Sequence, residues 1–181
     1  LTIIMKGNDP SKAAKQISLS DLGSITVSKE ETKQMAATIP RSSILGFIIG
    51  VLPGAGATIA SFLAYGMERN IVNDEEKEKF GKGSVNGLSA PETANNAACS
   101  GSFVPMLTLG IPGSGTTAVM LGALLGFGVQ PGPRLYMTNP EIFWSIIMSM
   151  YIGMVILLIL NLPLIPYIAR ILAVPKNYLI P

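Results

Sequence analysis

The sequence predicts an all-α, polytopic integral membrane protein with discontinuous or re-entrant helices, and three observations lead to that fold class. The chain of 181 residues is 49% hydrophobic and 13% charged, whereas a soluble domain carries roughly 25% charged residues. Ser42–Met67, Thr93–Pro133 and Ile142–Ala169 contain no Lys, Arg, Asp or Glu. Each exceeds the ~20 apolar residues that cross a bilayer core. The first two of these stretches also share a helix-breaking Pro-Gly-x-Gly segment.

That shared segment is Leu52–Thr58 (Leu-Pro-Gly-Ala-Gly-Ala-Thr), which returns as Ile111–Thr117 (Ile-Pro-Gly-Ser-Gly-Thr-Thr). Proline and glycine stop a helix in the middle of an apolar run. Unwound backbone at membrane depth is tolerated only where protein buries it or where it lines a polar cavity. Paired apolar segments that Gly and Pro interrupt are the best sequence pointer to the substrate site of a secondary transporter.

The rest of the composition excludes several classes of protein. The chain has no histidine, which removes the commonest catalytic base and metal ligand. The lone Cys99 excludes an internal disulfide and gives no metal-site spacing. A net charge of +2 does not indicate a nucleic-acid partner. The chain begins at Leu1 without an initiator Met or a signal-peptide pattern, and we expect a fragment of a longer membrane protein.

Residues 1–41 are polar, of mixed charge and rich in Ser, Thr and Lys, and we expect an extramembrane loop there. A short helix is predicted through Glu30–Lys33, and Arg41 marks the membrane edge. Residues 42–181 are then expected to form the transmembrane permease domain.

The first charge-free stretch is expected to contain two half-helices. The first, Ser43–Val51, holds Gly46 and Gly50, a small-residue spacing that lets another helix approach closely. A break at Pro53–Gly56 follows, and a second half-helix is predicted over Ala57–Met67. Two alternatives stay open, since this pair either spans the membrane or re-enters on the same side. The positive-inside rule does not decide between them, because both polar segments carry several Lys and Arg residues.

A run of charges, Glu68–Lys82, is predicted to be a solvated surface loop. The tetrapeptide Ser89–Glu92 (Ser-Ala-Pro-Glu) is expected to open the next helix, because it combines a capping box with an early proline. This helix is predicted to run towards Val104, where Pro105 kinks or ends it.

An apolar helix is predicted after the second break, over Thr116–Phe127. Gln130–Arg134 (Gln-Pro-Gly-Pro-Arg) is expected to form a rigid turn at a membrane boundary. Ile142–Leu160 is the plainest membrane-spanning helix in the sequence. Asn161–Pro163 is expected to interrupt it before a further apolar stretch, Leu164–Val174.

The two breaks are the first candidate site. A helix that begins after Pro-Gly-x-Gly exposes backbone N–H groups without intrahelical acceptors, and the helix macrodipole adds positive potential there. Such a helix start suits a carboxylate or a phosphate in a dry environment. The substrate-binding candidates are the residues of the breaks and the hydroxyls beside them: Pro53, Gly54, Ala55, Gly56, Thr58, Ser61, Pro112, Gly113, Ser114, Gly115, Thr116 and Thr117. The alternative interpretation is that the breaks are kinks needed only for packing.

Glu92, at the start of the longest charge-free stretch, is a candidate for binding a coupling ion. A charged residue inside the membrane costs about 2.5–3.5 kcal/mol on insertion scales and is usually functional. Asn95 and Asn96 share its helix face and offer amide oxygens to an ion or amide donors to a substrate. The alternative for Glu92 is an ordinary capping role. We expect no cofactor, and no metal other than a coupling Na⁺; H⁺ is the other candidate ion.

Five segments resemble the large permease subunit (TctA-like) of the tripartite tricarboxylate transporters, in the family's order. They are Gly50–Phe62, Ala90–Ala98, Leu107–Gly113, Gln130–Leu135 and Leu160–Pro163. The resemblance covers most of the chain from Arg41 onwards. It implies a multi-pass protein of the bacterial inner membrane, of which this chain is the second half of an inverted repeat.

The resemblance also implies an activity and partners. The family's large subunit works with a small membrane subunit and a periplasmic solute-binding protein, and imports citrate and related tricarboxylates by symport driven by an ion gradient. It implies that Pro53–Thr58, Glu92–Asn96 and Pro112–Thr117 form the site. We therefore predict the permease subunit of a secondary carboxylate transporter, embedded in the lipid bilayer, and not an enzyme.

Two rival interpretations stay open at this point. One is a non-transporting membrane scaffold or assembly subunit, in which the breaks serve packing alone. The other is an intramembrane hydrolase with Ser114 as its nucleophile, although no histidine is present to activate it and every lysine lies in a polar segment. Substituting Thr58 and Thr117 by Val in the full-length protein separates transporter from scaffold, and Ser114→Ala tests the hydrolase.

Overall fold

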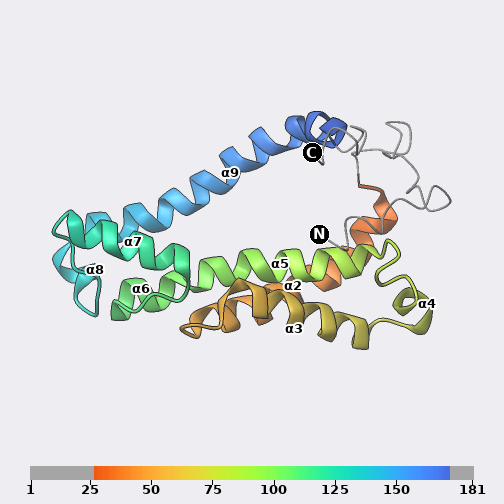
Figure 1. Ribbon diagram of the computed structural model, residues 1–181, viewed down its shortest axis with the longest axis horizontal. Coiled ribbons are helices and arrows are strands. Elements are labelled where there is room, and N and C mark those ends of the chain that lie inside the picture. Colours follow the sequence, from red (N-terminus) through yellow and green to blue (C-terminus); the bar gives the residue numbers. More distant parts are fainter. Residues whose placement is uncertain (1–26, 172–181) are drawn as a thin grey trace, which may run out of the picture. The chain divides into compact units, whose positions relative to one another are not determined.

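The computed structural model describes residues 27–171, and every element of that part of the chain is an α-helix (Figure 1). The prediction of an all-α fold is therefore confirmed. The helices are α2 (Lys29–Val51), α3 (Gly56–Ile71), α4 (Asp74–Lys77), α5 (Val85–Gly101), α6 (Phe103–Leu109), α7 (Gly115–Gly126), α8 (Leu135–Thr138) and α9 (Pro140–Ile171).

The described residues belong to two units. Val27–Ile147 forms one compact unit, and α9 from Met148 onwards belongs to the other. The expected polar loop lies outside the described residues up to Thr26, and so does the predicted apolar stretch beyond Ile171.

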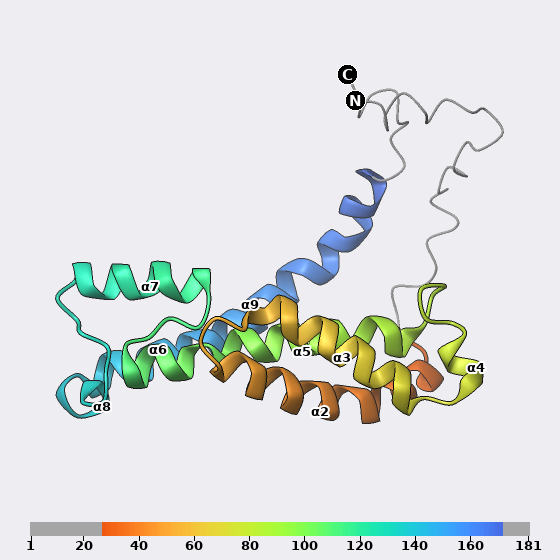
Figure 2. The same ribbon diagram turned by 60° about the horizontal axis from the view of Figure 1, so that its bottom comes forward.

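Helices α2, α3 and α5 pack side by side, as the two views agree (Figure 1; Figure 2). A Cβ atom on Gly46 of α2 would lie 2.6 Å from Ala94 Cα, and one on Gly50 would lie 2.6 Å from Ala98 Cα. Because Gly46 faces Ala94 and Gly50 faces Ala98, the residue numbers increase in the same direction on both helices. Helices α2 and α5 therefore run parallel, with their backbones almost in contact. The predicted small-residue spacing of α2 thus serves this close approach.

Small side chains also form the core between α3 and α5. The buried cluster consists only of alanines, at a spacing of four residues on each helix: Ala60 and Ala64, and Ala90, Ala94 and Ala98. Residues four apart lie on one helix face, so each helix presents a single alanine stripe. Packing through small residues is typical of helix interfaces in membranes.

A second core joins α6 to the segments that follow α7. Met106 and Leu107 of α6 pack with Val129 and Leu135. The backbone N–H of Gly132 donates to Leu107 O at 3.2 Å. The predicted Gln130–Arg134 turn is therefore fixed against α6.

Helix α2 is longer than predicted. The half-helix expected over Ser43–Val51 begins at Lys29 and continues through Pro40. Ser28 caps it with a capping box, in which Glu31 N donates to Ser28 Oγ at 3.2 Å and Ser28 N donates to Glu31 Oε2 at 2.7 Å. The short helix predicted around Glu30 is thus the first turn of α2, because one proline removes only one backbone hydrogen bond.

The start of α5 also differs from the prediction. The helix begins at Val85, and Ser84 Oγ accepts a hydrogen bond from Gly87 N at 2.9 Å. The predicted capping box at Ser89 and Glu92 is therefore wrong, and Pro91 lies inside the helix. Buried residues repeat every four positions from Asn86 onwards, so packing favours a helix that passes through the proline.

The predicted C-terminal end of α5, both ends of α7 and the course of α9 can also be compared with the structure. Helix α5 ends at Gly101, before the predicted Val104. The helix α7 agrees with the prediction to within one residue at each end. The predicted interruption of α9 at Asn161–Pro163 is wrong, because α9 is continuous through these residues.

Within residues 27–171, two helices are long and apolar enough to cross a membrane, as judged by length and composition. They are Lys29–Val51 of α2 and Pro140–Ile165 of α9. Helix α7 is apolar but shorter. Since α2 and α3 are joined directly by the first break, the structure contains the discontinuous helices that the repeated segment predicts.

Candidate functional site

The second predicted break packs against the end of α2 that leads into the first break. The first break separates α2 from α3, and the second separates α6 from α7. Gly113 of the second break is buried, and a Cβ atom on it would lie 3.3 Å from the carbonyl oxygen of Gly50 and 2.9 Å from Ser102 Cβ. Gly50 lies near the C-terminal end of α2, three residues before Pro53. The second break therefore packs close to the point where the first begins.

The first break presents open backbone. Gly54 has φ 84° and Gly56 has φ 69°, and both are left-handed conformations that favour glycine. No neighbouring atom would contact a Cβ on either residue within 4 Å in the described part of the chain. Ala55 is the N-cap of α3 and provides no side-chain hydrogen bond to its first turn. Thr58 is exposed beside these amides.

The second break is partly closed by its own hydroxyls. Thr117 N donates to Ser114 Oγ at 3.2 Å, and Ser114 N donates to Thr117 Oγ1 at 2.8 Å. Thr117 is only 1% exposed, so its hydroxyl serves the cap of α7. The amides of Gly115 and Thr116 have no side-chain acceptor within residues 27–171, and both residues are exposed. These two are the open donors at the start of α7.

Helix α5 has one apolar and one polar face. Ala90, Ala94 and Ala98 face the core, whereas Glu92, Asn95, Asn96 and Cys99 are exposed. The Asn96 amide donates to Glu92 O at 2.9 Å, and Cys99 Sγ lies 3.7 Å from Asn95 Oδ1. Along the described chain the Glu92 carboxylate makes no hydrogen bond or ion pair. Such a polar face is costly in lipid, so it requires water, a ligand or further protein.

Ser61, a predicted substrate ligand, lies in a helix contact. Its hydroxyl is 3.0 Å from Ala57 O and 3.2 Å from Pro91 O. The second carbonyl belongs to α5, so Ser61 links α3 to α5. Its exposure is intermediate, in contrast to that of Thr58.

The sequence reasoning missed a buried carboxylate. Glu68 was expected in the solvated loop, but it lies on α3 and is 0% exposed. Its Oε1 atom accepts hydrogen bonds from Thr38 Oγ1 at 2.7 Å, from Arg41 Nη2 at 2.7 Å and from Asn86 Nδ2 at 3.3 Å. The signal was present: Arg41 and Glu68 border the first charge-free stretch, and antiparallel half-helices return its two ends to the same level.

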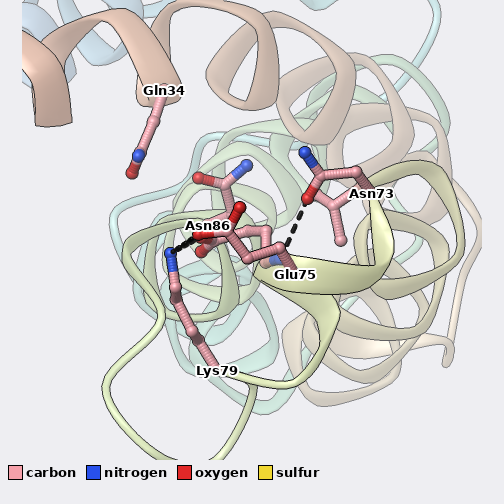
Figure 3. A pocket seen from close by; sticks show the side chains of 7 residues that line it. Gln34, Asn73, Glu75, Lys79 and Asn86 are labelled. Carbon is pink, nitrogen blue, oxygen red and sulfur yellow. Dashed lines mark hydrogen bonds and ion pairs between the residues drawn. The ribbon is translucent and has the colours of Figure 1, made fainter.

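A polar pocket of about 330 Å³ opens at the level where α2 and α5 begin, away from the breaks. Figure 3 shows Gln34, Lys79 and Asn86 around it. The hydroxyl of Ser84 donates to Glu76 Oε1 at 2.7 Å, and Lys79 Nζ lies 3.2 Å from Glu76 Oε2. The Ser84 hydrogen bond, followed by the interactions with Lys79, lowers the pKa of Glu76; the same carboxylate raises the pKa of Lys79.

No group of three or more His, Cys, Asp or Glu side chains that could hold a metal ion occurs in the part of the chain that the structure describes.

The fold and the breaks define a class of protein. A charge-poor chain whose described part is helical, and whose apolar runs are interrupted at two glycine-rich breaks, has the features of a membrane transporter. The model of the tripartite tricarboxylate transporter TctA family matches residues 1–181, and the chain belongs to that family.

Two relatives from Agrobacterium vitis are similar to the chain. An uncharacterized 52.8 kDa protein in the TAR-I ttuC′ 3′ region is 41% identical over 167 residues, which are 92% of this chain and 33% of the relative. An uncharacterized protein in the TAR-II ttuC′ 3′ region is 45% identical over 136 residues, which are 75% of this chain and 55% of the relative. The chain thus spans about a third and about half of these relatives. No solved structure matches it.

Proposed function

We propose that the chain is part of the permease subunit of a secondary transporter that imports tricarboxylates or related carboxylates. The observation that carries this proposal is the packing of Gly113, in the second break, against Gly50 at the end of α2 that leads into the first break. The open amides of the two helix starts suit an anionic solute. Family membership supports a transporter component.

The individual roles follow from exposure. Backbone amides near Gly56 and Gly115, with the exposed hydroxyl of Thr58, would hold solute carboxylates. The polar face of α5 would line the pathway, where Glu92 with the Asn95–Asn96 pair holds a coupling ion, Na⁺ or H⁺. Thr117 would support the cap of α7 rather than contact the solute.

The proposal includes the surroundings of the subunit. The protein would cross the bacterial inner membrane several times and pair with an inverted half, and alternating access would move one half against the other. A small membrane subunit and a periplasmic solute-binding protein would complete the transporter. The tripartite family to which the chain belongs supports such an assembly.

Uptake of labelled citrate and dicarboxylates tests this function. The full-length protein with its partner subunits is reconstituted in vesicles, and Na⁺ and pH gradients are imposed separately. Gradient-driven accumulation supports the proposal. No accumulation of any carboxylate, despite correct assembly, supports the scaffold. The hydrolase rival gains nothing from the structure, because within residues 27–171 the Ser114 side chain bonds only to Thr117.

A further inference from the structure

One end of the α2–α3–α5 unit contains a group of buried polar atoms without partners. Within residues 27–171, these atoms are Arg41 Nε, Ser42 Oγ, Glu68 Oε2, Asn86 Oδ1 and Ser89 Oγ. Burying a polar atom without a hydrogen bond is unfavourable, and native proteins contain few such atoms. Their concentration in one region therefore requires a physical explanation.

The helix register places these atoms in two adjacent layers. Asn86 Nδ2 contacts Glu68 Oε1 at 3.3 Å, so Asn86 and the carboxylate share one layer. Ser42 follows Thr38 by four residues on α2, and Ser89 follows Asn86 by three residues on α5. Because α2 and α5 run parallel, both serines belong to the next turn. The unpartnered oxygens thus come from all three helices.

The chemistry of these atoms selects the kind of ligand. Four of the five are oxygens, of which Glu68 Oε2 and Asn86 Oδ1 can only accept, while serine hydroxyls can also accept. Hard cations prefer such oxygen ligands. Glu68 supplies the single carboxylate and already pairs with Arg41, so a monovalent cation fits the charge better than a divalent one.

The surrounding charges are compatible with a cation. Arg41 bonds only Oε1 of Glu68, and its side chain is 38% exposed whereas that of Glu68 is 0% exposed. Glu68 Oε2 therefore has no partner within residues 27–171. Asn86 also lines the neighbouring pocket, where Glu75, Glu76 and Lys79 together carry one net negative charge.

We propose that a Na⁺ ion binds at this buried site, with Glu68 Oε2, Asn86 Oδ1 and a serine hydroxyl as ligands. The site is separate from the breaks and from Glu92. The binding of Na⁺ at this site does not depend on whether the protein transports a solute. A role of the site in coupling Na⁺ to transport rests on the proposed function.

Thermal unfolding of the purified full-length protein in detergent tests the site without solute or partner proteins. NaCl is compared with choline chloride and KCl at equal ionic strength and constant pH. We expect a saturable rise in Tm that is specific for Na⁺. Glu68→Gln, which replaces a cation ligand by an amide, should abolish the rise, and Glu78→Gln on the exposed α4 turn is the matched control that should retain it.

Ser89→Ala provides a second test if Glu68→Gln does not fold, since it removes only one hydroxyl. It should increase several-fold the Na⁺ concentration that gives half of the Tm shift. Equal shifts with Na⁺, K⁺ and choline would overturn the proposal and indicate buried water instead. A Na⁺ shift that survives in both variants would also overturn it. Failure of carboxylate uptake with an intact Na⁺ shift would reject the transport function and leave this site standing.

Discussion

Arg41 Nη2 lies 2.7 Å from Glu68 Oε1 and joins α2 to α3 across a sequence separation of 27 residues. The carboxylate is fully buried, while the arginine side chain reaches the surface. A buried ion pair is weak evidence for net stabilisation, but removing one partner leaves an uncompensated charge. The pair therefore fixes the register of α3 against α2 at the end remote from the breaks.

Replacing Arg41 by Met tests this relationship. Glu68 would keep only the neutral donors of Thr38 and Asn86, and we expect the free energy of unfolding to fall by about 3 kcal/mol. The partial exposure of Arg41 places the effect at the lower end of the range for buried pairs. Equilibrium unfolding in detergent gives the value. Arg69→Met, at an exposed position on α3, is the control and should change stability by less than about 0.5 kcal/mol. An equal loss in both variants would contradict the expectation.

The parallel contact of α2 and α5 leads to a second prediction. A Cβ on Gly46 would lie 2.6 Å from Ala94 Cα, and this backbone atom cannot move away without separating the helices. Gly46→Ala should destabilise the protein by about 3 kcal/mol, the upper end for overpacking. Thermal unfolding measures the loss.

Gly66→Ala is the matched substitution. Gly66 lies inside α3, and a Cβ there would meet nothing within 4 Å in the described structure. Alanine should therefore stabilise the helix by about 0.5–1 kcal/mol. If Gly46→Ala and Gly66→Ala changed the free energy of unfolding in the same direction, backbone contact between α2 and α5 would not determine the effect of Gly46→Ala.

The breaks were predictable because proline and glycine act locally. Pro53–Gly56 and Pro112–Gly115 interrupt apolar runs, and the structure has helix breaks at both. The effect of Pro91 inside α5 was predicted wrongly, because there the packing of the whole helix outweighs the local effect of the proline. The alanine stripe around Pro91 extends on both sides, and tertiary packing outweighs the loss of one backbone hydrogen bond.

The residues next to Glu68 in the sequence do not predict its surroundings, and the signal lies in the position of Arg41 at the other end of the first charge-free stretch. Glu68 adjoins Arg69, and the charged run that follows is typical of a solvated loop. Only the return of α3 beside α2 brings Glu68 to Thr38 and Arg41. Non-local contacts of this kind follow from topology. The contact of Gly113 with Gly50 is another example, because no spacing in the sequence indicates that the second break packs against the end of α2.

Glu76 leads to a prediction about pH. Its pKa is lowered by the hydrogen bond from Ser84 and then by Lys79. A carboxyl whose pKa is lower in the folded state stabilises the protein above its unfolded pKa of about 4.3, and this contribution is lost as the pH falls through the folded value. Glu76→Gln should cost about 1 kcal/mol at neutral pH. The difference from the wild type should shrink below about pH 5.

Unfolding of both proteins as a function of pH measures this difference. Glu78→Gln, at an exposed position of the same turn, is the control and should follow the wild type at each pH. A difference that stays constant between pH 7 and pH 4 would show that the Glu76 carboxylate does not stabilise the turn through its charge.

The two threonines that occupy equivalent positions in the breaks should respond differently to the same substitution. Thr58 is exposed, whereas Thr117 is buried and its hydroxyl accepts from Ser114 N at 2.8 Å. Thr117→Val removes half of the capping box, so it should lower stability by about 1 kcal/mol. Thr58→Val removes no hydrogen bond in the described structure and should leave the unfolding temperature unchanged.

If Thr58 contacts the solute, Thr58→Val should raise the KM for carboxylate uptake at normal expression, because a lost hydrogen bond to a charged group costs about 1.5–3 kcal/mol. Unchanged uptake by Thr58→Val would remove this hydroxyl from the solute site, and an unchanged unfolding temperature for Thr117→Val would show that the α7 cap contributes nothing to stability.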